Sequence, residues 1–169
     1  MSKKIIFFVL AFITLTNICY SAGSSGGSSG ESSGESSNKS DYSKAVDLIK
    51  SAKKYEKKEQ NDQAQERYKK ANTLLIKSNS DKPNNVDTLN YLGFTTRKLG
   101  DYANGEKYYL EGLAIDPNHK GINEYLGELY VATGRIELAN ERLSVLESCK
   151  CEEYNELKEI IEGIKKSKY

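Results

Sequence analysis

A leucine–glycine pair and a later glycine recur in this sequence at one fixed spacing. The pair Leu92 and Gly93 returns 34 residues further on, and Gly100 returns at the same offset. The later copies are Leu126, Gly127 and Gly134. A period of this length is typical of repeat proteins, in which each unit is a small helical hairpin that buries its apolar face on its neighbours. The period constrains the fold more than any other feature of the chain.

The recurring glycines have a physical role at each place. Gly93 and Gly127 remove a side chain where two helices are expected to cross, and so they allow close approach. Gly100 and Gly134 can take the positive φ that the residue after a helix often needs. Pro117 ends the unit, because the residue before a proline is pushed out of the helical region. These roles predict two helices in each unit, joined near the second glycine.

One unit carries further residues at set places. Leucines and aromatic residues accompany the glycines, and a proline closes the unit. The matching residues are Leu89, Leu92, Gly93, Gly100, Tyr102, Tyr109 and Pro117. With this pattern, residues 86–119 resemble a tetratricopeptide repeat (TPR). The resemblance implies an all-α, TPR-type solenoid of helical hairpins, whose last exposed apolar face is closed by a terminal helix.

The same pattern divides the rest of the domain. A third repeat covers residues 120–153, and a first repeat covers residues 45–78. Apolar residues at helical spacing then predict a capping helix over residues 154–168. We therefore expect one TPR domain over residues 41–169, built from three repeats and a C-terminal cap.

The first two repeats depart from the family pattern. The offset between them is 41 residues, an insertion of seven that predicts a second helix about two turns longer than usual. Asn61 and Asp62 occupy the place where we expect the turn of the first repeat. In the second repeat, Gly105 and Gly112 stand where the family usually has alanine. Those glycines predict either the least stable helix of the domain or an unusually close helix contact.

The N-terminal 40 residues have a different composition from the repeats. Residues 1–22 contain two lysines, an apolar stretch and then small residues, which is the layout of a secretory signal peptide. We expect an exported protein, periplasmic or secreted, with no stable transmembrane span in the mature chain. A lipoprotein attached through Cys19 and an uncleaved N-terminal membrane anchor are the alternatives. Residues 23–40 are rich in serine and glycine and predict a disordered linker.

Composition and motifs exclude several classes of function. The chain has 25 basic and 24 acidic side chains, so no long-range field favours nucleic acid. The sequence has no nucleophile motif, phosphate loop or zinc-protease motif, and we expect no catalytic residues, no metal and no cofactor. His119 is expected in a solvated turn. Cys149 and Cys151 are candidates for a disulfide, provided that the preceding helix has ended before them.

The resemblance also implies where binding occurs. In TPR proteins the first helix of each repeat lines a concave groove that holds a protein or peptide. Carried over by position, the groove residues are Asn90, Tyr91, Phe94, Arg97, Lys98, Glu124, Tyr125 and Glu128. Aromatic residues and arginine dominate binding energy at interfaces. We expect a scaffold module with a protein or peptide partner in the cell envelope; a self-associating structural component of an envelope complex is the alternative.

One subset of the family grips the C-terminal carboxylate of chaperones with lysines and asparagines at set groove positions. Those positions hold Ile49, Lys53, Tyr91, Gly121 and Tyr125 in this chain. Only Lys53 is charged, so the resemblance implies a peptide held through aromatic and mixed polar contacts instead.

Overall fold

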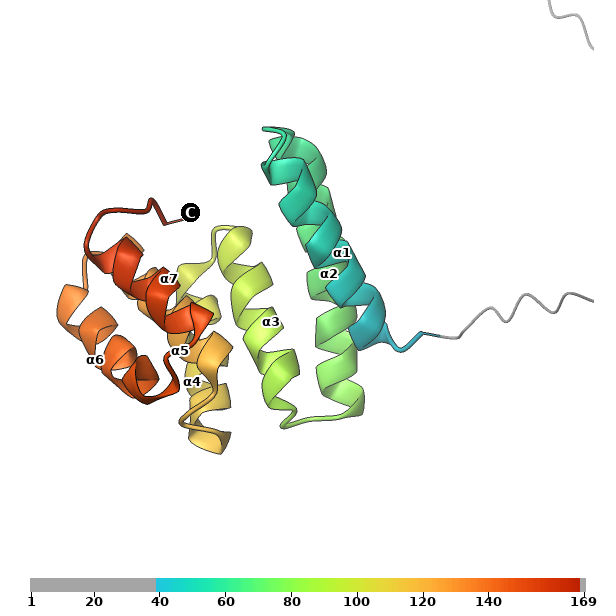
Figure 1. Cartoon of the computed structure of the whole chain (residues 1–169). Helices are drawn as coiled ribbons and strands as arrows, with labels where there is room; N and C mark the ends of the chain where they lie inside the picture. Colours follow the sequence, from blue (N-terminus) through green and yellow to red (C-terminus); the bar gives the residue numbers. More distant parts are fainter. Residues whose placement is uncertain (1–38, 168–169) are drawn as a thin grey trace, which may run out of the picture. The chain divides into compact units, whose positions relative to one another are not determined.

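Every regular element in the described part of this computed structural model, residues 39–167, is a helix (Figure 1). The elements are α1 (Asp41–Glu56), α2 (Asn61–Asp81), α3 (Val86–Lys98), α4 (Tyr102–Ile115), α5 (Lys120–Ala132), α6 (Ile136–Leu146), the 3-10 turn η1 (Glu147–Cys149) and α7 (Glu152–Ile161). The predicted signal peptide, Cys19 and most of the predicted linker lie outside the described residues. Within residues 39–167, no helix combines the length and the apolarity that crossing a membrane requires.

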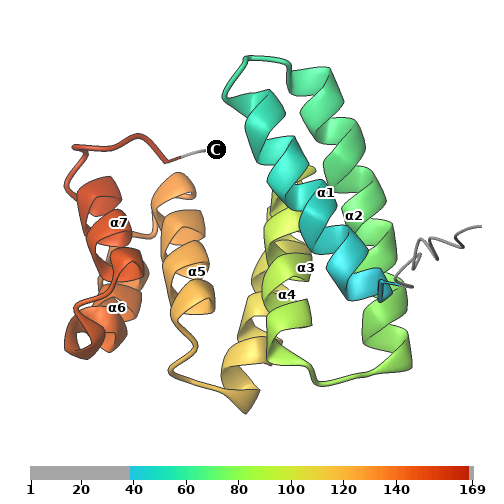
Figure 2. The ribbon, with the colours of Figure 1, turned by 45° about the vertical axis from the view of Figure 1, so that its right-hand side comes forward.

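The helices pack as successive antiparallel hairpins. α1 packs with α2, α3 with α4, and α5 with α6, while α7 lies against α5 and α6 (Figures 1 and 2). Contacts of α2 with α3 and of α4 with α5 join one hairpin to the next. The all-α solenoid of three TPR-type hairpins with a C-terminal capping helix, which the sequence predicts, is therefore confirmed.

Side chains at several helix starts accept bonds from the first turn. The carboxylate of Asp101 accepts from the backbone N–H of Asn104 at 3.1 Å, and Asn85 accepts from Thr88 N–H at 2.8 Å. These bonds satisfy N–H groups that have no partner inside the helix. His119 does the same for α5, because its Nδ1 accepts from Ile122 N–H at 3.1 Å. His119 thus lies in the turn before α5, as expected, but its side chain is only 18% exposed and caps the helix instead of pointing into solvent.

The turn inside each hairpin contains one residue with positive φ. This residue is Gly100 (φ 91°) in the second repeat and Gly134 (φ 74°) in the third, as the sequence predicts. In the first repeat it is Glu59 (φ 59°), while Asn61 already begins α2. The prediction that Asn61 and Asp62 form this turn was therefore wrong. The first repeat makes the turn earlier, at Glu59, and without a glycine.

Glycines inside the helices create close contacts between them. A Cβ built on Gly93 would lie 2.4 Å from the ring of Tyr109, which is fully buried in α4. A Cβ on Gly127 would lie 2.5 Å from Leu157 of the cap. Gly105 brings α4 against the backbone of α3, since its Cβ would lie 3.1 Å from the carbonyl oxygen of Gly93. Of the two alternatives that the sequence left open for Gly105, the structure shows the close helix contact.

The second helix of the first repeat is the longest in the domain. α2 has 21 residues, whereas α4 has 14 and α6 has 11, in agreement with the insertion noted in the sequence. Its added turns still pack, because Leu75 is fully buried and Lys77 pairs with Asp41 at the start of α1. The insertion thus lengthens the contact between α1 and α2, and the added turns of α2 remain packed.

Candidate functional site

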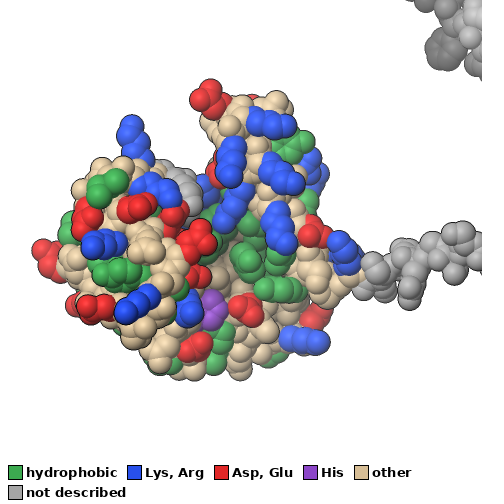
Figure 3. Space-filling model, in the orientation of Figure 1, with side chains coloured by type: hydrophobic (Ala, Val, Ile, Leu, Met, Phe, Trp, Pro, Cys, Tyr) green, Lys and Arg blue, Asp and Glu red, His purple; other side chains and the backbone are tan. Residues whose placement is uncertain are grey.

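A groove runs over the first helices of the repeats. Figure 3 shows hydrophobic side chains in a hollow between α1, which carries lysines, and the side of α7, which carries acidic residues. The most apolar part, which we call the aromatic cleft, has a volume of about 510 Å³. Its lining residues are Lys53, Glu56, Lys57, Asn61, Phe94, Lys98, Tyr125 and Glu128.

Stacked aromatic rings form the floor of the aromatic cleft. The rings of Phe94 and Tyr125 have centroids 5.1 Å apart, and Tyr68 meets Phe94 edge-on at 5.7 Å. The ammonium of Lys53 lies 4.6 Å from the centroid of Phe94 and donates to the hydroxyl of Tyr125 at 3.3 Å. Phe94 is only 1% exposed, so it supports the floor from below. Burial raises the pKa of Tyr125 far above its usual value, which keeps its hydroxyl neutral.

A buried ion pair lies beneath this floor. The side chains of Arg97 and Glu128 are 0% and 1% exposed, and their charged atoms are 3.3 Å apart. Arg97 also donates to the backbone oxygen of Tyr125 at 2.6 Å. The sequence predicted both residues as groove surface; instead, the ion pair joins α3 to α5 under Tyr125. Their role in the site is to hold that aromatic ring in place.

A second charged cluster joins the first repeat to the second. The ammonium of Lys98 lies 2.7 Å from the carboxylate of Glu56, which also accepts from the hydroxyl of Tyr68 at 2.8 Å. The Lys98 side chain is only 6% exposed. Burial lowers the pKa of Lys98, while its bond to Glu56 acts in the opposite direction. Lys98 therefore forms part of the cleft wall through an ion pair with Glu56.

Tyr125 also borders two polar hollows next to the aromatic cleft. One, of about 510 Å³, is lined by Asn90, Tyr91, Asp116, Asn118, His119, Lys120, Gly121, Glu124, Tyr125 and Glu153. Of the predicted residues here, Asn90 is 7% exposed, and Tyr91 is half-buried against Tyr42 with ring centroids 6.0 Å apart. Glu124 lies on the rim. The predicted residues thus line two neighbouring hollows that share Tyr125, except Arg97, which is buried beneath them.

The second polar hollow, which we call the acidic recess, contains residues that the repeat pattern did not predict. It has a volume of about 260 Å³ and is lined by Lys53, Glu124, Tyr125, Glu152, Glu153 and Glu156. Three of these glutamates belong to α7, which begins at Glu152, two residues before the predicted capping helix, and ends at Ile161 rather than at residue 168. Glu152 and Glu153 thus lie in the cap and not in the third repeat, where the sequence placed them. The sequence signal was present, since Glu152, Glu153 and Glu156 share the first turns of the cap, but the resemblance assigns no groove positions to a capping helix.

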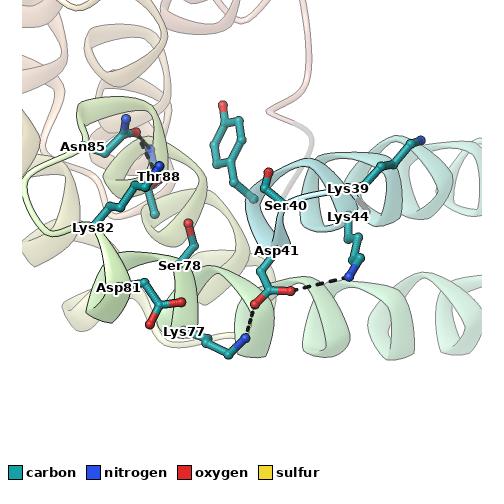
Figure 4. A pocket seen from close by; sticks show the side chains of 11 residues that line it. Lys39, Ser40, Asp41, Lys44, Lys77, Ser78, Asp81, Lys82, Asn85 and Thr88 are labelled. Carbon is teal, nitrogen blue, oxygen red and sulfur yellow. Dashed lines mark hydrogen bonds and ion pairs between the residues drawn. The ribbon is translucent and has the colours of Figure 1, made fainter. Parts of the chain in front are cut away.

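A further cavity, of about 560 Å³, lies where α1 begins and α2 ends (Figure 4). Three of its charged residues interact: Asp41 bonds to Lys77 and lies 3.8 Å from Lys44. The bond from Lys77 is the main cause that lowers the pKa of Asp41. Asn85 faces Thr88 as the cap of α3. These interactions fasten the end of the first hairpin.

Cys149 and Cys151 are joined by a disulfide, with Cα atoms 5.1 Å apart. Cys149 ends the 3-10 turn, Lys150 takes positive φ, and Cys151 precedes α7. The regular helix has ended at Leu146, which is the condition that the two-residue spacing requires. The bridge lies at the junction between the third repeat and the cap. In residues 39–167, no three His, Cys, Asp or Glu side chains form a group suited to a metal ion.

Comparison with known proteins places the fold. No protein-family model matches the chain, and no curated protein matches it. Among solved structures, the first TPR of Spaghetti (RPAP3), bound to an HSP90 peptide SRMEEVD, matches with a TM-score of 0.52. The match covers 73% of this chain and 94% of that one, at 22% sequence identity. The fold is TPR-like. At this identity the likeness extends to the arrangement of the helices and not to the ligand.

Proposed function

We propose that this TPR-like domain is a binding module that holds a segment of another protein in its groove. The observation that carries the proposal is the aromatic cleft, where Phe94 and Tyr125 lie under the ammonium of Lys53. A hollow with an aromatic floor and charged walls favours an apolar side chain whose neighbours pair with those charges. The peptide bound by the matched TPR structure is in keeping with this use of the fold.

The two walls of the groove define the chemistry of the partner. Lys53 and Lys57 lie on the α1 side, and Glu152, Glu153 and Glu156 lie on the α7 side. A segment with an aromatic or large apolar residue, basic residues toward α7 and an acidic group toward α1 complements both walls. We therefore propose a partner segment of mixed charge with an aromatic anchor.

Recognition of a terminal carboxylate is not part of the proposal. Ile49 is 2% exposed and belongs to the core, and Gly121 has no side chain to offer. Of the five positions that grip a carboxylate in one subset of the family, only Lys53 can supply a cation. We propose instead that side chains of the partner determine its specificity.

We propose that the protein is exported and that it binds a partner rather than catalysing a reaction. The apolar N-terminal stretch followed by a serine- and glycine-rich segment supports a protein that acts in the periplasm or outside the cell. The buried charges of the cleft form ion pairs, Arg97 with Glu128 and Lys98 with Glu56, and Lys53 lies over the ring of Phe94, an arrangement that supports binding.

Selection from a displayed peptide library tests the binding function. Peptides enriched on the chain should lose binding to Lys57→Glu and to Glu153→Lys, which reverse one charge on each wall. Lys54→Glu is the matched control, because Lys54 is exposed on the same helix and does not line the cleft. Enriched peptides that bind all variants equally would move the site elsewhere. Sedimentation that shows oligomers and a library without enriched peptides would favour the assembly function.

A further inference from the structure

The disulfide between Cys149 and Cys151 lies between the ends of two helices. Cys149 ends the 3-10 turn that follows α6, and its Sγ lies 2.9 Å from the carbonyl oxygen of Leu146, the last residue of α6. Cys151 is the residue immediately before α7. One sulfur therefore lies at the carbonyl end of a helix, which disfavours negative charge. The other belongs to a helix N-terminus, which stabilises negative charge.

Cys151 occupies the place at which other helices of this chain carry a capping side chain. At the starts of α1, α3, α4 and α5, that side chain accepts a hydrogen bond from the backbone N–H three residues later. Cys151 has the extended backbone usual for this position, but its sulfur is bonded to Cys149 and makes no capping bond. In the open form, its thiolate can accept from the N–H of Tyr154 in the same way. Opening the bridge thus completes the cap of α7.

The short loop of the bridge favours its opening by a thiol. Only Lys150 separates the two cysteines, and a cross-link that closes so small a loop removes little entropy from the unfolded chain. Lys150 has a φ of 45°, a left-handed conformation that is unfavourable for a lysine, and opening the bridge releases it. Both cysteines are partly exposed, so a thiol in solution can reach them.

We propose that Cys149 and Cys151 form a redox-active disulfide that oxidises thiols. An attacking thiolate bonds to the sulfur of Cys149 and breaks the bridge, and Cys151 leaves as the thiolate that the start of α7 stabilises. A second thiol of the donor then displaces Cys149 from the mixed disulfide. The donor gains a disulfide and the chain gains two thiols, so two electrons and two protons pass from the donor to the chain.

Charged neighbours act on Cys151 in both directions. Lys150 favours its thiolate, whereas Glu152 and Glu153, in the first turn of α7, oppose it. Lys150 and Glu152 are exposed, so water and salt screen their effects more than that of an N–H group bonded to the sulfur. Glu152 and Glu153 also line the acidic recess. A cysteine of a segment held in the groove is thus one source of the thiol, which rests on the proposed function; a free low-molecular-weight thiol is the other.

Exchange with glutathione tests the activity without any partner. The oxidised chain, incubated with reduced glutathione and then alkylated, should show Cys149 and Cys151 as free thiols, and mass spectrometry reads each cysteine separately. A peptide with two cysteines replaces glutathione in a second arm and should itself become oxidised. Faster exchange with the peptide would assign the donor to polypeptides, and faster exchange with glutathione would assign it to small thiols. A bridge that stays oxidised in both arms and opens only in dithiothreitol would overturn the proposal.

Single variants test the separate roles of the two sulfurs. At neutral pH, Cys151 in the variant Cys149→Ser should be alkylated severalfold faster than Cys149 in the variant Cys151→Ser. Its rate should also reach half of its maximum at a lower pH. Circular dichroism checks that both variants keep their helices. If either variant fails to fold, tandem mass spectrometry of the reduced wild-type chain supplies the same comparison. Equal pH profiles for the two cysteines would contradict the assignment of Cys151 as the leaving thiolate.

Discussion

Among single residues, two glycines of the second repeat differ in what surrounds them. A Cβ on Gly93 would overlap three ring atoms of Tyr109, all within 2.7 Å, and that ring is fully buried. A Cβ on Gly112 would come within 2.4 Å of only the terminal methyl of Ile122, with Leu89 at 3.6 Å. Tyr109 and Ile122 are both fully buried, but the tyrosine ring is rigid, whereas the end of the isoleucine side chain can change its rotamer.

This difference predicts opposite outcomes for the same substitution. Gly93→Ala should reduce the free energy of unfolding by about 1–3 kcal/mol, because the added methyl forces α3 and α4 apart. Gly112→Ala should be near neutral, or stabilising by up to about 1 kcal/mol, because alanine has the higher helix propensity. Urea denaturation of the two variants measures both values. Equal losses for the two would show that Gly112 is as tightly enclosed as Gly93.

Between elements, the buried pair of Arg97 and Glu128 couples α3 to α5. Glu128→Gln keeps the shape of the side chain but leaves the arginine charge buried without its counterion. We expect a loss of about 3–5 kcal/mol in the free energy of unfolding. The double variant Arg97→Met, Glu128→Met should recover most of this loss, because it removes both charges together. A double variant as unstable as Glu128→Gln would show that the pair stabilises the fold by itself.

The packing of the capping helix α7 depends on one buried leucine. Leu157 is fully buried against Gly127, whereas Ile164, beyond the end of α7, is 73% exposed. Leu157→Ala should cost about 2–5 kcal/mol, because it removes buried methyl groups and leaves a cavity beside α5. The control Ile164→Ala should leave stability nearly unchanged. Thermal unfolding of the two variants compares them, and an equal shift in Tm would show that the cap contributes little.

Across the whole molecule, the sequence predicts the fold better than the site. Gly93 marks a helix crossing, Gly100 marks a turn and Leu126 marks the core. Each of these positions recurs in the neighbouring repeat. The hairpins and the cap therefore follow from the period. The turn at Glu59 could not be predicted in this way, because the first repeat lacks the glycine that marks the turn in the other two repeats.

The groove was harder to predict, because surface and interior alternate within one helix turn. Arg97 has the composition of a binding residue, but its burial depends on Glu128, which lies 31 residues away and on another helix. Position within a repeat does not report such a pairing. The glutamates of α7 were missed for a different reason: the cap has no counterpart in the repeat, and only the closed solenoid brings it beside Tyr125.

The buried tyrosines give the whole domain a characteristic response to alkaline pH. Burial raises the pKa of Tyr42 from 10.0 to about 12, and it raises those of Tyr68, Tyr109 and Tyr125 further. The unfolded chain releases these protons first, at its ordinary value near 10, so stability is fully present below that pH and is lost as pH rises above it. The pKa values of Tyr91 and Tyr130 are raised as well, and the lowered pKa of Lys98 acts in the opposite direction, as one group against these six.

We therefore expect the urea midpoint to fall steadily above about pH 10, together with the appearance of tyrosinate absorbance. Tyr42→Phe removes one titrating hydroxyl and keeps the ring, so its midpoint should fall less steeply than that of the wild type between about pH 10 and 12. Tyr102→Phe is the matched control, because Tyr102 is 39% exposed. A midpoint that stays constant up to about pH 12 would mean that the tyrosines titrate alike in the folded and unfolded chains, and that the aromatic floor of the groove is open to water.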